Sequence, residues 1–319
     1  LYQAAKEKAA KESTPENKKG VGVTIGIYGC GLDGVDGAEV LIELTKEGVS
    51  VYGTWQDHGQ GADMGMLGTA HEGLRPLGIA PEKIKLIMND TGVMPNAGPS
   101  GGSRSQVMTG NAIKNGCEQL VEAMKKADGS FRTYDEMVAE GLPLKYNGKW
   151  AASMNSNCDE NGQGNPFAVY MYGAFLAEVN VNTKTGKTTV EGMTVMADIG
   201  KINNKLVVDG QIYGGVAQGV GLALSEDFED YDKHSTMLGA GIPYAKDIPD
   251  KFDIYYFENA RENGPFGAAG VGELPLTSPH VAIVNAIYNA TGVRIRQLPA
   301  RPEKVLAGLK KLEQDKQPA

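Results

Sequence analysis

Two long stretches in which apolar and polar residues alternate restrict the fold more than any other feature of the sequence. The first spans residues 39–54 and folds back at 46–48, and the second spans 170–200 and folds back at 185–186. Alternation with a period of two, interrupted by a glycine-containing turn, predicts an antiparallel hairpin. A further strand is expected over 21–29. Because helical patterns separate these segments, the sequence favours the α+β class over a doubly wound parallel sheet.

Helices are expected where apolar residues recur at spacings of three and four. The segments with this pattern are 62–77, 103–127, 207–227 and the stretch after residue 278, with short strands expected over 83–90 and 250–258. At the last helix, Ser278 is suited to cap the N-terminus, Pro279 fits the first turn and Gly292 supplies a stop.

The pattern divides the chain into two lobes, each a hairpin-rich mixed sheet packed with helices. The expected parts are a leader or linker over 1–20, a first α+β lobe over 21–130, an irregular connection over 131–165 and a second α+β lobe over 166–319. The chain opens at Leu1, inside what resembles an Ala/Lys/Glu helix. We therefore expect a preceding segment, and the chain to be either part of a longer polypeptide or one separately encoded subunit of a larger enzyme.

Composition excludes several classes of protein. The net charge of −8 and the absence of a basic run interleaved with aromatic residues argue against nucleic-acid binding. No apolar stretch reaches the roughly 20 residues that span a bilayer, and the N-terminus lacks the apolar core of a signal peptide, so a cytoplasmic protein is expected. The three cysteines form no C-x-x-C pair and the four histidines no H-E-x-x-H pair. Neither a zinc nor an iron–sulfur site is therefore supported, and any metal is not expected to be held by protein histidines.

One carboxylate, Glu273, lies in a glycine-rich loop directly before a helix. Glycines at 267, 270 and 272 allow the backbone to approach a ligand closely, and Pro275 stiffens the exit from the loop. A carboxylate mounted in this way is suited to act as a catalytic base. The alternative is an ordinary solvated loop glutamate.

Residues 99–113, PSGGSRSQVMTGNAI, predict an anion site. Two glycines, hydroxyl side chains and Arg104 stand where the free backbone N–H groups of a helix N-terminus point outward. The alternative is a plain capped helix start. By contrast, residues 29–34 match G-x-G-x-x-G but lead into a strand, so a nicotinamide dinucleotide site is not favoured.

Two further loops are candidates for ligand contact. Residues 54–65, TWQDHGQGADMG, place Gln60 between two glycines, where its amide could bind a heteroaromatic ring; the alternative is a tight turn entering a helix. Residues 203–211, NNKLVVDGQ, precede a glycine-rich helix and could place Lys205 and Gln211 in a cleft, although a surface turn is the simpler interpretation.

Nearly the whole chain resembles the C-terminal half of the molybdenum-binding subunit of the xanthine oxidase family of molybdenum hydroxylases. The order of GIYGCGLDG, WQDHGQGADMG, PNAGPSGGSRSQVMTGNAI, ADIGKINNKLVVDGQIYGGVAQGVG, GAAGVGELPLTSPH and LPARPEKVL carries this resemblance. It is strongest to the aldehyde oxidoreductase group of sulfate-reducing bacteria. The implied fold is the family's C-terminal molybdopterin-binding domain.

The resemblance implies that Glu273 is the essential general base in the oxidation of an aldehyde to a carboxylic acid, with water as the oxygen source. It implies that Gln211 lies near the metal, that molybdenum is held through the pterin dithiolene, and that the pterin carries a nucleotide, cytosine in the most similar group. The implied cofactor-binding residues are Trp55, His58, Gly59, Gln60, Gly61, Pro99, Ser100, Gly101, Gly102, Ser103, Arg104, Ser105, Asn203, Lys205, Leu206, Val207, Val208 and Gly272.

The family's iron–sulfur domains and the first half of its molybdenum subunit have no counterpart in this chain. The resemblance therefore implies partners: that missing half, and a [2Fe-2S] domain or subunit that removes electrons, in a complete enzyme expected to be a dimer. Alternatives are a noncatalytic subunit that only grips a cofactor, a purine or N-heterocycle hydroxylase, and a carbon monoxide dehydrogenase of the same family.

Overall fold

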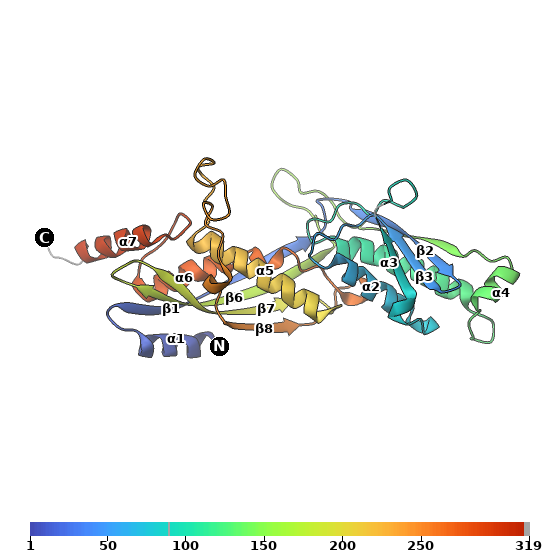
Figure 1. Cartoon of the computed structure of the whole chain (residues 1–319), viewed down its shortest axis with the longest axis horizontal. Helices are drawn as coiled ribbons and strands as arrows, with labels where there is room; N and C mark the ends of the chain where they lie inside the picture. The colour runs from blue at the N-terminus through green and yellow to red at the C-terminus, as the bar shows by residue number, and fades with distance from the viewer. Residues whose placement is uncertain (89, 316–319) are drawn as a thin grey trace.

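The computed structural model describes residues 1–88 and 90–315 of the 319-residue chain. It is elongated, with one four-stranded sheet towards each end (Figure 1). Sheet A has the strand order β1-β6-β7-β8, with β7 and β8 parallel and the other neighbours antiparallel. Its strands are β1 (Asn17–Cys30), β6 (Val169–Asn182), β7 (Thr188–Asp198) and β8 (Lys251–Phe257).

Sheet B has the order β4-β3-β2-β5, with β3 and β4 parallel and the other neighbours antiparallel. Its strands are β2 (Gly37–Thr45), β3 (Gly48–Gly53), β4 (Ile84–Met88) and β5 (Lys145–Ala151). Two mixed sheets packed with helices confirm the predicted α+β class and both predicted hairpins. The strand expected over 83–90 forms as β4, and residue 89 of the expected range lies outside the described residues.

Helices cover one face of each sheet. The α-helices are α1 (Tyr2–Glu12), α2 (Ala62–Gly73), α3 (Ser105–Met124), α4 (Tyr134–Ala139), α5 (Lys205–Leu224), α6 (Pro279–Thr291) and α7 (Pro302–Gln314). Short 3-10 helices are η1 (Arg75–Leu77), η2 (Pro81–Lys83), η3 (Ala245–Asp247), η4 (Pro265–Gly267) and η5 (Leu274–Leu276). The helices approach the sheets closely at glycines: a Cβ on Gly22 of β1 would lie 2.1 Å from the Ala282 oxygen of α6, and one on Gly148 of β5 would lie 2.1 Å from the Ala112 oxygen of α3.

The opposite faces of the two sheets differ. On sheet A, α1 covers only the end around Val21 and Leu176, on the side away from α5 and α6 (Figure 1). Beyond α1, strand register aligns large apolar side chains that remain exposed, among them Ile25 at 72% and Phe257 at 53%. We call this set the apolar face; it consists of Val23, Ile25, Ile27, Tyr172, Tyr255 and Phe257.

The corresponding face of sheet B is polar. Lys149 of β5 pairs with Glu39 of β2 at 2.9 Å, and Lys145 pairs with Glu43 at 3.4 Å. These residues alternate along β2 with the buried side chains that pack towards α3. No helix among the described residues is long and apolar enough to cross a membrane.

Long-range pairing departs from the expected lobes in two places. β1 was assigned to the first lobe from its position in the chain, but it pairs along its whole length with β6, in the second. Residues 131–165 were expected to be irregular, yet they contain α4 and β5, and β5 completes sheet B. Residues 1–20 are likewise more than a linker, since α1 packs on β1. Alternation identifies a strand but does not identify its partner.

Local signals were more accurate, with one exception. The helix at 279–291 forms and ends at Gly292, whose φ of 78° is left-handed as a C-terminal stop requires. Ser278, however, does not cap it: its hydroxyl donates to the Ile25 oxygen of β1 instead. The residue therefore ties the Glu273 loop to sheet A.

Candidate functional site

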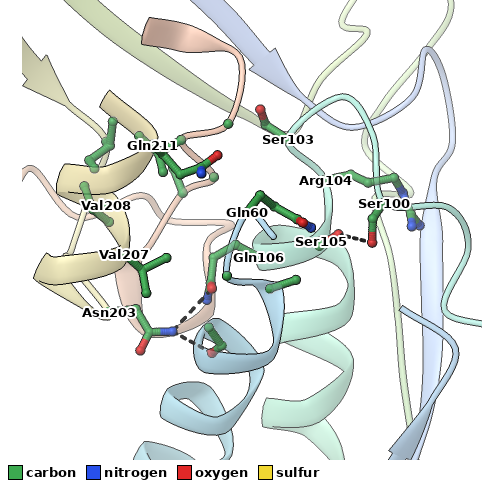
Figure 2. Close-up of a pocket in the computed structure, with 18 of the residues that line it drawn as sticks. Gln60, Ser100, Ser103, Arg104, Ser105, Gln106, Asn203, Val207, Val208 and Gln211 are labelled. Atoms are coloured by element: carbon green, nitrogen blue, oxygen red, sulfur yellow. Dashed lines mark hydrogen bonds between the residues drawn. The ribbon is translucent and has the colours of Figure 1, made fainter. Parts of the chain in front are cut away.

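A cavity of about 310 Å³ lies where the two lobes meet (Figure 2). One wall comes from the loop after β3, the start of α2 and the turn before α3. The other comes from the end of β7, the start of α5 and residues 269–273. A second cavity of about 340 Å³ shares Gln106, Lys201 and Asn203 with the first. Four segments far apart in sequence therefore build one site: residues 58–66, 100–106, 199–211 and 269–273. The first three overlap the segments that the sequence predicts to contact a ligand.

Glu273 lines this cavity from the loop before η5. The loop is held on both sides: the Ala269 amide donates to the Ile199 oxygen at 3.0 Å, and Pro275 is buried against α5, where a Cβ on Gly215 would meet it at 2.5 Å. The Glu273 side chain is half-buried. Burial raises its pKa above the ordinary value, while the backbone N–H groups of Gly102, Glu273 and Ser103 partly oppose that rise. A half-buried carboxylate with a raised pKa is a stronger base than a solvated one.

The turn before α3 presents Ser103 to this carboxylate. The Ser103 hydroxyl donates to Oε2 of Glu273 and accepts the Glu273 amide at 3.1 Å. Helix α3 itself has no side-chain cap, so the predicted alternative of a plain capped helix start is not what the structure contains. The Ser105 hydroxyl donates to Ser100 Oγ at 3.0 Å (Figure 2).

Arg104 was expected to help to hold an anion, but its guanidinium is committed to the protein. It is 1% exposed and donates to both carboxylate oxygens of Asp36, each at 2.8 Å. Its other bonds go to the backbone oxygens of Ala97, Pro99 and Gly37. Burial works to raise the pKa of Asp36, but Arg104 and nearby amides hold it below the ordinary value. Arg104 therefore shapes the turn, and no donor is left over for a ligand.

The loop after β3 is organised by Asp57, which sequence reasoning missed. Its carboxylate accepts the amides of Gly59 at 2.8 Å, Gly61 at 3.2 Å and Asp63 at 2.9 Å. Burial opposes these bonds, yet they hold the pKa of Asp57 below its ordinary value. The spacing of an aspartate two and four residues before glycines was the signal available in the sequence.

Gln60 lines the cavity from this loop, but its amide also folds back on the loop. The side-chain nitrogen donates to the Gln56 oxygen at 2.9 Å, and the side-chain oxygen accepts the His58 amide. Gln56 in turn exchanges hydrogen bonds with Ser100, its amide donating to Ser100 Oγ at 2.9 Å. The two candidate loops on this wall are thus one hydrogen-bonded unit.

Residues 203–211 join the two walls. Asn204 caps α5 by accepting the Val207 amide at 3.3 Å. The Asn203 side chain donates across the cavity edge to the Gly65 oxygen at 2.7 Å and to Thr69 Oγ1 at 3.2 Å, both on α2. It also donates to Gln106 Oε1 at 3.3 Å (Figure 2). The segment is therefore the start of helix α5 and not only a surface turn: Asn203 and Gln211 line the cavity, whereas Lys205 lies outside it.

The predicted site residues divide into two groups. Those that line the main cavity are His58, Gln60, Gly61, Ser100, Gly101, Ser103, Arg104, Ser105, Asn203, Val207, Val208, Gln211, Gly272 and Glu273. Those that do not line it are Trp55, Gly59, Pro99, Gly102, Lys205 and Leu206. Trp55 is buried and donates to Asp63 at 3.0 Å, Lys205 pairs with Asp209, and Leu206 is 81% exposed.

Lys201 and Gln106 line both cavities and were missed by sequence reasoning. Among the described residues, Lys201 makes no ion pair, so the main cavity has an ammonium group available for an anion. Gln106 donates to Thr69 at 3.0 Å. Within the described parts of the chain, no three His, Cys, Asp or Glu side chains gather in a way that could hold a metal ion. Cys30 and Cys117 are buried, whereas Cys158 is exposed.

Comparisons with known proteins agree with this arrangement. The family model described as molybdopterin cofactor-binding domain matches residues 1–249. The aldehyde oxidoreductase of Megalodesulfovibrio gigas is 62% identical over 311 residues, which is 97% of this chain and 34% of that protein. The aldehyde oxidoreductase molybdenum-binding subunit PaoC of Escherichia coli K12 is 29% identical over 286 residues, covering 85% of this chain and 38% of that subunit.

Comparison of the fold with solved structures identifies the same group of proteins. The solved aldehyde oxidoreductase of Desulfovibrio gigas superimposes with a TM-score of 0.95 at 61% identity, covering 97% of this chain and 34% of that one. The fold alone is shared with quinoline 2-oxidoreductase of Pseudomonas putida 86, at a TM-score of 0.78 and 19% identity. The chain spans about a third of the length of its first relatives. It belongs to the molybdopterin cofactor-binding domain family, within the xanthine oxidase family of molybdenum hydroxylases.

Proposed function

We propose that this chain is the part of an aldehyde oxidoreductase that carries the catalytic base, and that the complete enzyme oxidises an aldehyde to a carboxylic acid with water as the oxygen source. The observation that carries the proposal is Glu273, half-buried on the wall of a cavity between two lobes, with its pKa raised by burial. The relatives named aldehyde oxidoreductase support the substrate class.

The cavity fits a molybdopterin dinucleotide. Such a cofactor is anionic and rich in hydrogen-bonding groups, and the wall offers an uncapped α3 N-terminus, the Lys201 ammonium and the Ser100 and Ser105 hydroxyls. Gln60, Asn203 and Gln211 would contribute amides, and the second cavity beside Lys201 gives room for the nucleotide, which we propose is cytosine. When bound, this group supplies a molybdenum centre that accepts two electrons from the substrate.

The residues of the chain then have separate tasks. Glu273 takes the proton of the water-derived oxygen, and its partial burial strengthens it as a base. Gln211 lines the cavity near Gly272 and would orient the reacting groups through its amide. Val207 and Val208 line the cavity on the α5 side with apolar side chains, which would exclude water there.

The chain is proposed to work with the remaining part of the enzyme, namely the other half of the molybdenum subunit and a [2Fe-2S] domain or subunit, in a cytoplasmic dimer. The relatives are two to three times longer than the segment matched, which supports additional polypeptide. The apolar face of sheet A is a suitable contact surface, because exposed apolar patches rimmed by polar residues mark protein interfaces.

Glu273→Gln in the complete enzyme tests the base. The amide is nearly isosteric but cannot take a proton, so we expect aldehyde-dependent dye reduction to fall at least about a hundredfold while the molybdenum content stays unchanged. Asp209→Asn, which removes a carboxylate on α5 that pairs with Lys205 and Tyr256, is the matched control. An active Glu273→Gln enzyme would refute the proposal.

A substrate panel separates the remaining alternatives. Turnover of purines, N-heterocycles or carbon monoxide without aldehyde turnover would reassign the substrate class. Failure of the complete enzyme to oxidise any of them, with molybdenum bound, would make the chain a noncatalytic cofactor-gripping subunit.

A further inference from the structure

Ser103 and Glu273 form a closed pair of hydrogen bonds across the cavity. The Ser103 hydroxyl donates to the Glu273 carboxylate and accepts the Glu273 amide, so one side chain fixes both ends of the glutamate. The two residues lie 170 positions apart and on opposite walls. In Figure 2, Ser103 lies at the end of its turn, away from Ser100 and Ser105.

The backbone of Ser103 is held in an unfavourable conformation. Its φ is 52°, in the left-handed region that residues other than glycine adopt only where the surroundings impose it. The preceding Gly102 also has a positive φ, of 58°, and its oxygen accepts the Gly31 amide at 2.9 Å. On the opposite wall, Gly270 leaves room for this turn, because a Cβ there would lie 2.2 Å from the Ser103 oxygen.

The buried ion pair described above is what fixes this turn. Arg104 follows Ser103 directly, and its guanidinium is bound on one side by Asp36 and on the other by the backbone oxygens of Ala97 and Pro99. Asp36 also accepts the amides of Leu32 and Gly37. The fork of an arginine bound in this way cannot be replaced by a lysine, which offers no planar pair of donors.

We propose that Ser103 is a positioning residue for Glu273, and that the buried Asp36–Arg104 pair holds Ser103 in the conformation that this contact requires. The inference rests on the proposed function, in which Glu273 is the base. Under this proposal, Arg104 stabilises the turn that positions Glu273 and does not contact the cofactor. A hydroxyl side chain suits this role because it donates to the carboxylate and accepts from the amide at the same time.

A hydrogen bond to the charged form of an acid favours that form. Loss of the Ser103 donor should therefore raise the pKa of Glu273 further above its ordinary value. His58 and Lys201 line the same cavity as Glu273 from other segments. On β1, Tyr28 and Cys30 face Glu273, and the pKa values of these two groups are raised, mainly through burial and in part through the glutamate. Both are neutral near pH 7, so neither obscures the titration of Glu273.

The test is the acidic limb of kcat/KM against pH in the complete enzyme with Ser103→Ala and Ser103→Gly. A base must be deprotonated to act, so a raised pKa moves the loss of activity to higher pH. We expect a shift of about one pH unit in both variants, from the loss of one charge-assisted hydrogen bond. Ser103→Gly removes the backbone strain along with the hydroxyl, so an equal shift in both variants assigns the effect to the hydroxyl.

Infrared titration of the Glu273 carboxyl, identified by its loss in Glu273→Gln, gives a readout that does not depend on turnover. It should show the same shift. Ser225→Ala is the matched control, because it removes a hydroxyl that donates to the Gly241 oxygen at 2.6 Å, outside the Glu273 loop and the cavity; its Glu273 titration should equal that of the unaltered enzyme. Arg104→Lys should reproduce the Ser103→Ala shift.

Three outcomes would overturn the inference. An unshifted carboxyl titration in both Ser103 variants removes the positioning role, even if activity falls. Loss of molybdenum without a shift makes Ser103 a cofactor ligand only. An unshifted Arg104→Lys enzyme removes the role of the ion pair. An active Glu273→Gln enzyme, by contrast, defeats the proposed function itself, so the two failures are distinguishable.

Discussion

Sheets A and B are built alike on one face and unlike on the other. Both have four strands, and both are approached by a helix at a glycine, Gly22 under α6 and Gly148 under α3. On the remaining face, sheet B carries lysine–glutamate pairs such as Lys149 with Glu39, whereas sheet A carries the apolar face. Near α1, sheet A also carries the pair of Lys251 with Glu178.

The difference indicates that the open face of sheet B is a solvent-exposed surface. Charged pairs on a sheet face are compatible with solvent, and antiparallel sheets often leave one face solvated in this way. Several large exposed apolar side chains in register are better explained by another protein surface packed against them. Under the proposed function, we therefore propose that the half of the molecule that carries Glu273 contacts the remaining polypeptide.

The largest expected loss of stability tests whether the two helix–sheet contacts, α6 on sheet A and α3 on sheet B, are equivalent. Gly22→Val and Gly148→Val each force a side chain into a helix backbone at about 2.1 Å. We expect each to cost at least about 3 kcal/mol of the free energy of unfolding, measured by denaturant unfolding. If only one variant is destabilised, the two helix–sheet contacts are not equivalent.

The next effect contrasts a covered with an uncovered position. Ile42 of β2 is fully buried against α3, and Ile42→Ala should cost about 2–5 kcal/mol. Ile25→Ala, on the apolar face, should change the stability of the chain by about 0.5 kcal/mol or less, because the side chain is already exposed to water. A large loss with Ile25→Ala would show that the face is covered within the chain itself.

Introducing charged residues on the apolar face tests whether this face of sheet A, unlike the open face of sheet B, is an interface. Ile25→Lys combined with Ile27→Lys should leave unfolding of the separate chain nearly unchanged but weaken its assembly with the remaining polypeptide at least about tenfold, a cost of about 1.4 kcal/mol. Co-purification and analytical ultracentrifugation measure this. Val138→Lys, at an exposed apolar residue of α4 in the other half of the molecule, is the control. Unimpaired assembly of the double variant would place the contact elsewhere.

The smallest effect concerns the polar face of sheet B. Glu39→Gln removes its ion pair with Lys149, and both side chains are well exposed. Exposed pairs contribute about 0–1 kcal/mol, so we expect a change within that range that vanishes at high salt. Impaired assembly in this variant would show that both open faces are interfaces.

Features set by neighbouring residues were predictable from the sequence, and those set by distant ones were not. The β6–β7 hairpin and the Gly292 stop follow from a few adjacent residues, and so does the loop that carries Glu273. The pairing of β1 with β6 depends on residues more than a hundred positions away, for which local alternation contains no information. For the same reason, Arg104 was predicted as an anion ligand: its partner Asp36 lies 68 positions earlier.

The Asn203 side chain that bridges to α2 has a thermodynamic consequence. It is a polar connection between the bodies built on the two sheets, and the cavity lies along the same seam. A molecule seated there would bind both bodies at once and so couple their melting. In calorimetry, two overlapping heat-absorption peaks should merge into one as that molecule is titrated in.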